Sequence, residues 1–208
     1  MKQVLLIFIL VFFCIAGYAQ QQEDSVYQFQ ANVRCGNRDI PMTFVRHSNP
    51  KYPHYVIAGI GVYGSPAIDT TAAGRLVVPD SVSDPLGRRY LVWALGRQTF
   101  AHCTQLTEID LPDGLKEIGD QAFLGCTRLR EVTLPKALRV IYPFAFRDCH
   151  SLSVIRLHAP TRPAVYDDVF DLRTLDRATL IIPAGTSELY SNSLVWGLFH
   201  YTMEDFDP

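Results

Sequence analysis

The amino-acid sequence predicts a β-rich solenoid, a stack of short coils that share one elongated core. The first observation is that Phe100, Phe123 and Phe146 follow one another at equal intervals. The second is that other apolar positions keep the same interval: Cys103, Cys126 and Cys149; Leu106, Leu129 and Leu152; Ile109, Val132 and Ile155; Leu111, Leu134 and Leu157. A period of about 23 residues lies within the range of leucine-rich repeats and indicates a solenoid, since one such coil cannot bury its apolar face without an equivalent neighbour.

Three clear coils are expected over residues 92–160, at 92–114, 115–137 and 138–160. Each contains Leu-x-x-Ile/Val-x-Leu, whose final alternation of apolar and other residues predicts a strand. Residues 119–123 suit a single helical or 3₁₀ turn. A degenerate fourth coil is expected one period further on, in register with the others, with these apolar positions: Val169, Leu172, Leu175, Ala178 and Leu180.

Both ends of the stack need caps, because an uncapped end would expose apolar surface. Residues 20–91 contain four candidate strands, at 25–34, 40–45, 55–63 and 76–79, and predict a β-rich N-terminal cap. Residues 161–208 hold the fourth coil and a small C-terminal cap. Thr186 or Ser187 is expected to N-cap a short helix that carries Leu189, Tyr190, Leu194 and Trp196.

The first 19 residues predict a secretory signal peptide. Lys2 supplies the positive start, residues 4–15 are apolar, and small residues at Gly17 and Ala19 suit cleavage before Gln20. The chain is therefore expected in the periplasm, at the cell surface or outside the cell, without membrane insertion after cleavage. Its formal net charge of −2 argues against nucleic acid as a partner.

Three of the four cysteines after the signal peptide are repeat positions. Side chains in a column of parallel neighbours point the same way, which is unsuitable for a disulfide. Cysteine packs well in a core as a free thiol. We expect Cys103, Cys126 and Cys149 to be reduced, and Leu172, one repeat after Cys149, supports a packing role.

No residue pattern predicts catalysis, a metal site or a cofactor. The six histidines lack metal-binding spacing, and His102 and His150 occupy variable repeat positions that favour surface histidines. Gly59, Gly61 and Gly64 resemble a dinucleotide fingerprint, but Pro66 would break the helix that should follow. An enzyme or enzyme inhibitor with its activity in the non-repeat segment 20–87 stays open as the alternative.

The repeats resemble a known family. Residues 111–135, LPDGLKEIGDQAFLGCTRLREVTLP, are similar to the BspA-type leucine-rich repeat of anaerobic Gram-negative bacteria and some protists. Residues 181–190 and 76–83 resemble the segments that close and lead into such repeats. The resemblance implies a leucine-rich-repeat solenoid in a secreted or cell-surface binding protein, with adhesin roles for some members and no shared catalytic residues.

Alternation along the strands predicts an outward-facing binding surface for a protein or glycan. Its residues form two columns: Glu108, Glu131, Val154 and Arg177; Asp110, Thr133, Arg156 and Thr179. This face is expected to be acidic at its first coil and basic at its last, and a solvated face without a partner is the alternative. Aromatic anchors are missing from it, and Trp93, Tyr142 and Tyr166 are the candidates elsewhere.

Three short motifs resemble the Asp-Ser/Thr-(aliphatic or Thr) O-glycosylation signal of some bacteria that carry this repeat. They place candidate modified residues at Ser25, Thr70 and Ser81, all before the repeats.

Overall fold

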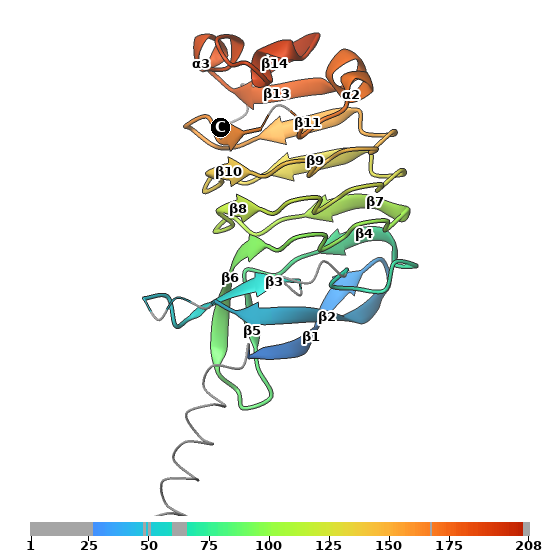
Figure 1. Ribbon diagram of the computed structural model, residues 1–208, viewed down its shortest axis with the longest axis vertical. Helices are drawn as coiled ribbons and strands as arrows, with labels where there is room; N and C mark the ends of the chain where they lie inside the picture. The colour runs from blue at the N-terminus through green and yellow to red at the C-terminus, as the bar shows by residue number, and fades with distance from the viewer. Residues whose placement is uncertain (1–26, 48, 50, 60–65, 167, 206–208) are drawn as a thin grey trace, which may run out of the picture.

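The computed structural model describes residues 27–47, 49, 51–59, 66–166 and 168–205. These form an elongated stack of flat coils (Figure 1), which confirms the predicted β-rich solenoid. The predicted signal peptide and Ser25 lie outside the described residues.

Two columns of parallel strands run along the stack. The first column contains β4 (Ala73–Val77), β7 (Gln105–Asp110), β9 (Glu131–Leu134), β11 (Val154–Leu157), β13 (Thr179–Pro183) and β14 (Tyr201–Asp205). The second contains β3 (Tyr55–Ala58), β6 (Arg89–Leu95), β8 (Glu117–Ile118), β10 (Val140–Ile141) and β12 (Ala164–Val165). Each regular coil therefore contributes one strand to each column, and backbone hydrogen bonds join one coil to the next.

An antiparallel hairpin joins the two columns at the N-terminal end. Strands β1 (Gln28–Cys35) and β2 (Arg38–Arg46) pair with each other, and they pair with β4 and β3 on their outer edges. A short strand, β5 (Ser81–Ser83), pairs antiparallel with β6. The inward side chains of the hairpin, such as Val33, Met42 and Phe44, are buried, so the hairpin covers the end of the core.

The centre of the solenoid is a column of stacked phenylalanine rings. Phe100 and Phe123 have centroids 5.3 Å apart, Phe123 and Phe146 4.9 Å, and Phe146 and Phe170 5.5 Å. The first three rings are fully buried. Offset stacking adds stabilisation to the burial of their area, so each ring depends on the coils on both sides of it.

The segment before each phenylalanine is a turn that bonds to the next coil. The backbone N–H of Phe123 donates to the carbonyl oxygen of Ala145 at 2.8 Å. Gln121 has a φ of 57°, and this left-handed conformation prevents the expected helical turn over residues 119–123. Gly119 lies so close to the previous coil that a Cβ atom there would be 2.6 Å from the carbonyl carbon of Gly96.

The fourth coil is longer than the sequence predicts. Phe170, not Val169, stacks on Phe146, and Ile155 pairs with Leu180, whereas the repeat period predicts Ala178. One extra residue comes before Val169, because the Phe146 N–H donates to the Val169 carbonyl oxygen where the Phe123 N–H donates to that of Ala145. Helix α2 (Leu172–Arg177) accounts for the further shift at Leu180, because a helix advances about 1.5 Å per residue where a strand advances about 3.3 Å. A coil with a helix needs more residues for the same circuit.

Leu172 is the first residue of this helix and is 82% exposed. The interpretation that Leu172 replaces a packing cysteine is therefore wrong. The other expected apolar positions of the coil are buried: Val169, Leu175, Ala178 and Leu180.

The C-terminal cap consists of three short elements. Helix α3 (Ser187–Ser191) follows Thr186, the 3₁₀ helix η2 (Trp196–Leu198) comes next, and the acidic tail returns as β14 beside β13. The single helix expected here is split, because Asn192 ends α3, and Leu194 is 87% exposed. Trp196 is buried against Phe170, and its indole N–H donates to the carbonyl oxygen of Pro163 at 3.1 Å.

All four described cysteines are buried free thiols, which confirms the expectation for the three repeat cysteines. The Sγ of Cys126 donates to the carbonyl oxygen of Phe100, and that of Cys149 to the carbonyl oxygen of Phe123. Burial raises the pKa of Cys103 to about 12 and also raises the pKa values of Cys126 and Cys149. Because the thiolate is the reactive form, these cysteines are chemically inert in the folded chain.

Unfolding of the chain from residue 20 onward should expose four titratable thiols. The folded protein should react slowly with Ellman's reagent at pH 8, and addition of guanidinium chloride should reveal all four thiols without a reductant. Detection of two thiols or none in the unfolded, unreduced chain would mean that disulfides are present and would contradict the packing role.

Candidate functional site

The outward positions of β7, β9 and β11 make up the surface proposed for binding on the basis of the sequence, here called the strand face. Glu108 lies beside Glu131, Glu131 beside Val154, and Thr133 beside Arg156. Their strand neighbours Ile109, Val132 and Ile155 point into the core. The alternation along these three coils is as expected.

The fourth coil departs from the expected columns. Val154 pairs with Thr179, and Arg156 pairs with Ile181. Arg177 is the last residue of α2 and has no place in the strand column. The expected positions of Arg177 and Thr179 are wrong, because the helix lengthens the coil.

Several charges on the strand face are already paired with one another. Asp110 forms a 2.8 Å salt bridge with Arg75, and Arg156 contacts Glu131 at 3.5 Å and Asp205 at 3.2 Å. Arg156 thus lies between two carboxylates. The expected basic last coil is wrong, because the acidic tail, as β14, lies beside it.

Aromatic side chains gather at the beginning of the second strand column. The rings of His47, Tyr52 and Tyr55 lie 5.5, 4.9 and 5.2 Å from the ring of Trp93. All four side chains are partly exposed. We call these four residues the aromatic cluster, and it offers flat apolar rings to solvent.

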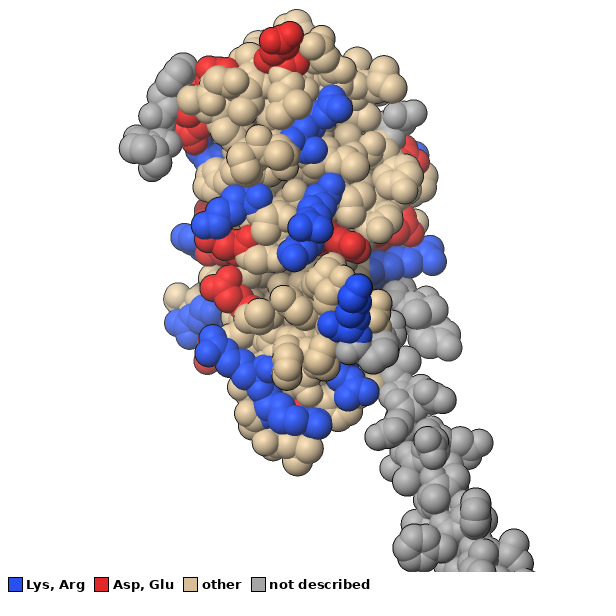
Figure 2. All heavy atoms as spheres, turned by 90° about the vertical axis from the view of Figure 1, so that its left-hand side faces the viewer, with Lys and Arg blue, Asp and Glu red and all other residues tan. Residues whose placement is uncertain are grey.

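A row of basic residues continues from this cluster along the stack. The Lys116 ammonium lies 4.8 Å from the centroid of the Trp93 ring, within the range of a cation–π contact. Backbone hydrogen bonds link Lys116 to Trp93 and Arg139 to Lys116. Ala164 bonds to Arg139 in turn, and Arg162 precedes this strand by two residues. Figure 2 shows the side on which β6, β8 and β10 lie, where Lys and Arg occur at successive levels of the stack.

Sequence reasoning identified Trp93 as an aromatic candidate and missed the basic row. The signal was present, because Trp93, Lys116, Arg139 and Arg162 are spaced by the same interval as the core phenylalanines. His47, Tyr52 and Tyr55 carry no repeat signal, since their contact with Trp93 depends on the pairing of β3 with β6.

The hydrogen-bond network around Asp84, in the N-terminal segment, stabilises the fold and offers no free group for binding or catalysis. The Asp84 carboxylate is fully buried and accepts hydrogen bonds from the Tyr27 hydroxyl at 2.9 Å, from Arg88 Nε at 2.6 Å and from the backbone N–H of Leu86. Burial acts to raise the pKa of Asp84, but hydrogen bonds from Arg88, Tyr27 and Leu86 outweigh it and lower the pKa to about 2. Its acceptor sites are occupied by the protein, so Asp84 fixes the turn before β6.

Two candidate O-glycosylation residues are described. Thr70 is exposed in a turn. Ser81 lies in β5, and its hydroxyl accepts a hydrogen bond from Arg89 Nε at 2.9 Å. Of the two residues, Thr70 is the more exposed. Of the glycine motif, only Gly59 is described, and it follows β3 and lies against Thr99.

A model of the BspA type leucine rich repeat region matches residues 93–194 as six copies. The chain belongs to the BspA-type leucine-rich repeat family. This match includes the strand face and the basic row, whereas three of the four residues of the aromatic cluster precede it. No curated protein matches the sequence.

Three solved structures of bacterial leucine-rich repeat proteins are similar to this BspA-type chain. A cell surface protein from Faecalibacterium prausnitzii is 19% identical with a TM-score of 0.50, over 88% of this chain and 44% of that one. A Treponema pallidum protein is 22% identical (TM-score 0.44; 72% of this chain, 55% of that one). A Bacteroides capillosus protein is also 22% identical (TM-score 0.40; 61% and 98%). This chain thus spans about half the length of the first two of these.

Leucine-rich repeats of this kind are interaction modules. None of the helices described here is long and apolar enough to cross a membrane.

Among the described residues, one group of side chains has the geometry for a metal ion, namely Asp148, His150 and Asp171. His150 is half exposed, as the sequence predicts for a surface histidine.

The Asp84 network should make stability depend on pH in the acid range. The folded-state pKa of about 2 lies below the ordinary value of 3.8, so between these values the unfolded chain binds more protons. The ionised Asp84 carboxylate therefore contributes its full share to the free energy of unfolding above about pH 4, and this share is lost as the pH falls through about 2. The difference in the free energy of unfolding between the parent and Asp84→Asn, measured with urea, should therefore decrease as the pH falls over this range. A difference that stays constant would contradict the stabilising role of the Asp84 carboxylate.

Proposed function

We propose that this BspA-type chain is an exported interaction module without catalysis of its own. It binds a glycan or a protein that carries negative charge, at the cell surface or outside the cell, in an adhesin-like role. The observation that carries the proposal is the contact between the aromatic cluster and the basic row on one side of the solenoid. The family membership and the predicted signal peptide support export.

The aromatic cluster supplies what the strand face lacks. Tryptophan and tyrosine are enriched at the residues that dominate binding energy, because they bury a large rigid surface and retain a polar tip. Trp93 is surrounded by three other rings, so it is already fixed before a ligand arrives. A preorganised surface loses less conformational entropy on binding.

The basic row supplies charge complementarity. No salt bridge among the described residues involves Lys116, Arg139 or Arg162. Their charges are available to an anionic partner, whereas Asp110, Glu131 and Arg156 of the strand face have partners within the chain. Unpaired surface charges raise the association rate of an oppositely charged ligand.

The alternative of an enzyme or inhibitor in the segment 20–87 has less support. The buried carboxylate of that segment, Asp84, is saturated with hydrogen bonds from the protein. The described part of the segment otherwise contributes strands to the stack and rings to the aromatic cluster.

Two matched double variants decide which face binds. Trp93→Ala with Lys116→Ala removes the centre of the proposed surface, and Glu108→Lys with Arg156→Glu changes the strand face. We expect the first variant to lose at least about tenfold in affinity for acidic glycans on an array that includes sulfated and uronic-acid sugars, a loss of about 1.4 kcal/mol. The second should bind like the parent.

Circular dichroism melts check that both variants remain folded. Loss of binding only in the Glu108→Lys, Arg156→Glu variant would move the site to the strand face. Absence of binding by the parent to every glycan and to immobilised acidic matrix proteins would contradict the proposed function.

A further inference from the structure

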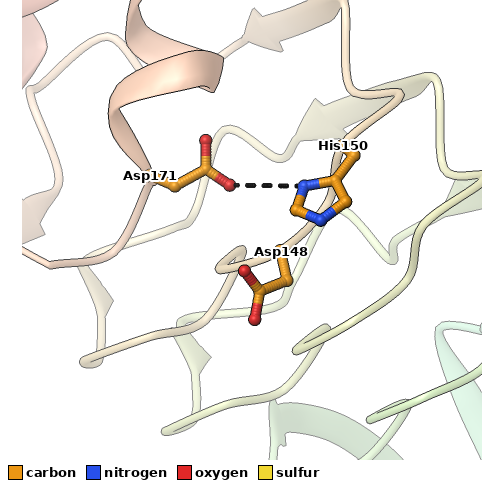
Figure 3. A group of neighbouring side chains, drawn as sticks. All are labelled: Asp148, His150 and Asp171. Carbon is orange, nitrogen blue, oxygen red and sulfur yellow. Dashed lines mark ion pairs between the residues drawn. The ribbon is translucent and has the colours of Figure 1, made fainter.

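Three side chains with metal-binding atoms meet where the last regular coil joins the fourth. Asp148 and His150 come from the turn that follows Phe146, and Asp171 precedes α2 (Figure 3). One ligand atom from each lies within 4.8 Å of the other two, and His150 Nδ1 is 3.9 Å from Asp171 Oδ2. The group therefore spans two successive coils of the stack.

Asp171 provides an independent observation. Its Oδ1 accepts a hydrogen bond from the backbone N–H of Thr174 at 2.8 Å and so caps α2. Its Oδ2 is buried and has no hydrogen-bond partner, and it is the one buried side-chain oxygen or nitrogen of the described residues in this condition. A buried carboxylate oxygen without a hydrogen-bond donor is costly, and the nearest cationic group to this atom is His150 Nδ1 at 3.9 Å, which is beyond hydrogen-bond distance. A metal ion between the two side chains would satisfy it.

The surroundings leave room for an ion. The three residues line an open hollow of about 520 Å³, together with Arg147, Asp168 and Arg173. The Arg147 guanidinium is placed over the Phe144 ring, 5.2 Å from its centroid. No described salt bridge joins Arg147 or Arg173 to Asp171.

We propose that Asp148, His150 and Asp171 bind one divalent transition-metal ion, with Zn²⁺ as the best fit. One imidazole nitrogen and two carboxylates suit Zn²⁺, whereas Ca²⁺ and Mg²⁺ favour oxygen ligands alone. Ligand atoms around Zn²⁺ lie about 3.3 Å apart for bond lengths near about 2.0–2.1 Å, so the group must close slightly. Asp148 is exposed and can rotate toward the other two.

A bound ion would connect the regular coils to the C-terminal cap. Asp148 and Asp171 come from successive coils, and the ion would add a cross-link between them. An ion that binds only the folded chain stabilises it increasingly as its concentration rises above the dissociation constant. The proposed metal site would therefore stabilise the C-terminal end of the solenoid, and it is separate from the aromatic cluster.

The test uses the chain from residue 20 onward after treatment with EDTA, and Zn²⁺ itself as the probe. Isothermal titration calorimetry should give one site with a dissociation constant of about 10 µM or lower, and Zn²⁺ should raise the melting temperature. Asp148→Asn and His150→Ala should each weaken binding at least tenfold and abolish the rise in melting temperature. Their melting temperatures without metal should equal that of the parent, because both side chains are exposed.

His158→Ala removes another exposed histidine, away from the group, and should bind Zn²⁺ like the parent. Co²⁺ absorption provides a second readout, since its visible bands should disappear in His150→Ala. Equal Zn²⁺ affinity of the parent, Asp148→Asn and His150→Ala would show an adventitious ion only and would overturn the proposal. Absence of Zn²⁺ binding by the parent at millimolar concentration would overturn it as well.

Discussion

The structure depends on the stacking of one coil on the next. A single coil has a core of a few side chains and two open faces, so it has no stable fold alone. Stacking removes both faces from water. It aligns the rings of Phe100, Phe123, Phe146 and Phe170, and it satisfies backbone groups such as the Phe123 N–H across the coils. The hydrophobic effect and hydrogen bonding thus favour the same coil-to-coil spacing.

The two ends follow from this constraint, because a stack without caps would leave apolar surface and unpaired strands exposed. The β1–β2 hairpin closes one end by pairing with both strand columns. At the other end, Trp196 and Phe199 cover the last ring, Phe170. The outward positions do not contribute to the core, and they are therefore free to carry an aromatic cluster, a basic row or a group of metal-binding side chains.

The sequence predicts what repeats and misses what depends on irregular structure. The period located the phenylalanine, cysteine and leucine columns, since each buried position recurs with identical spacing. It failed in the fourth coil, where α2 lengthens the circuit, exposes Leu172 and removes Arg177 from the strand face. The ion pair between Arg156 and Asp205 could not be predicted from the sequence either, because nothing in the acidic tail indicates that it forms the strand β14.

The aromatic cluster and the basic row were likewise predictable from the sequence only in part. The row from Trp93 through Lys116 to Arg139 follows the period and was available from the sequence. The contact of Tyr52 and Tyr55 with Trp93 needed the fold, since these residues are distant in the sequence and meet only because β3 pairs with β6. The Asp148, His150 and Asp171 group also needed the fold, because α2 determines where the Asp171 carboxylate points.

The denaturant midpoint of Phe123→Ala tests the dependence on coil stacking most directly. Phe123 is fully buried between two rings, so the substitution should leave a cavity that neither coil can fill and should cost about 3–5 kcal/mol of stability. Lys136→Ala, an exposed change near the end of the same coil, should cost less than about 0.5 kcal/mol. An equally small effect of both substitutions would contradict the account.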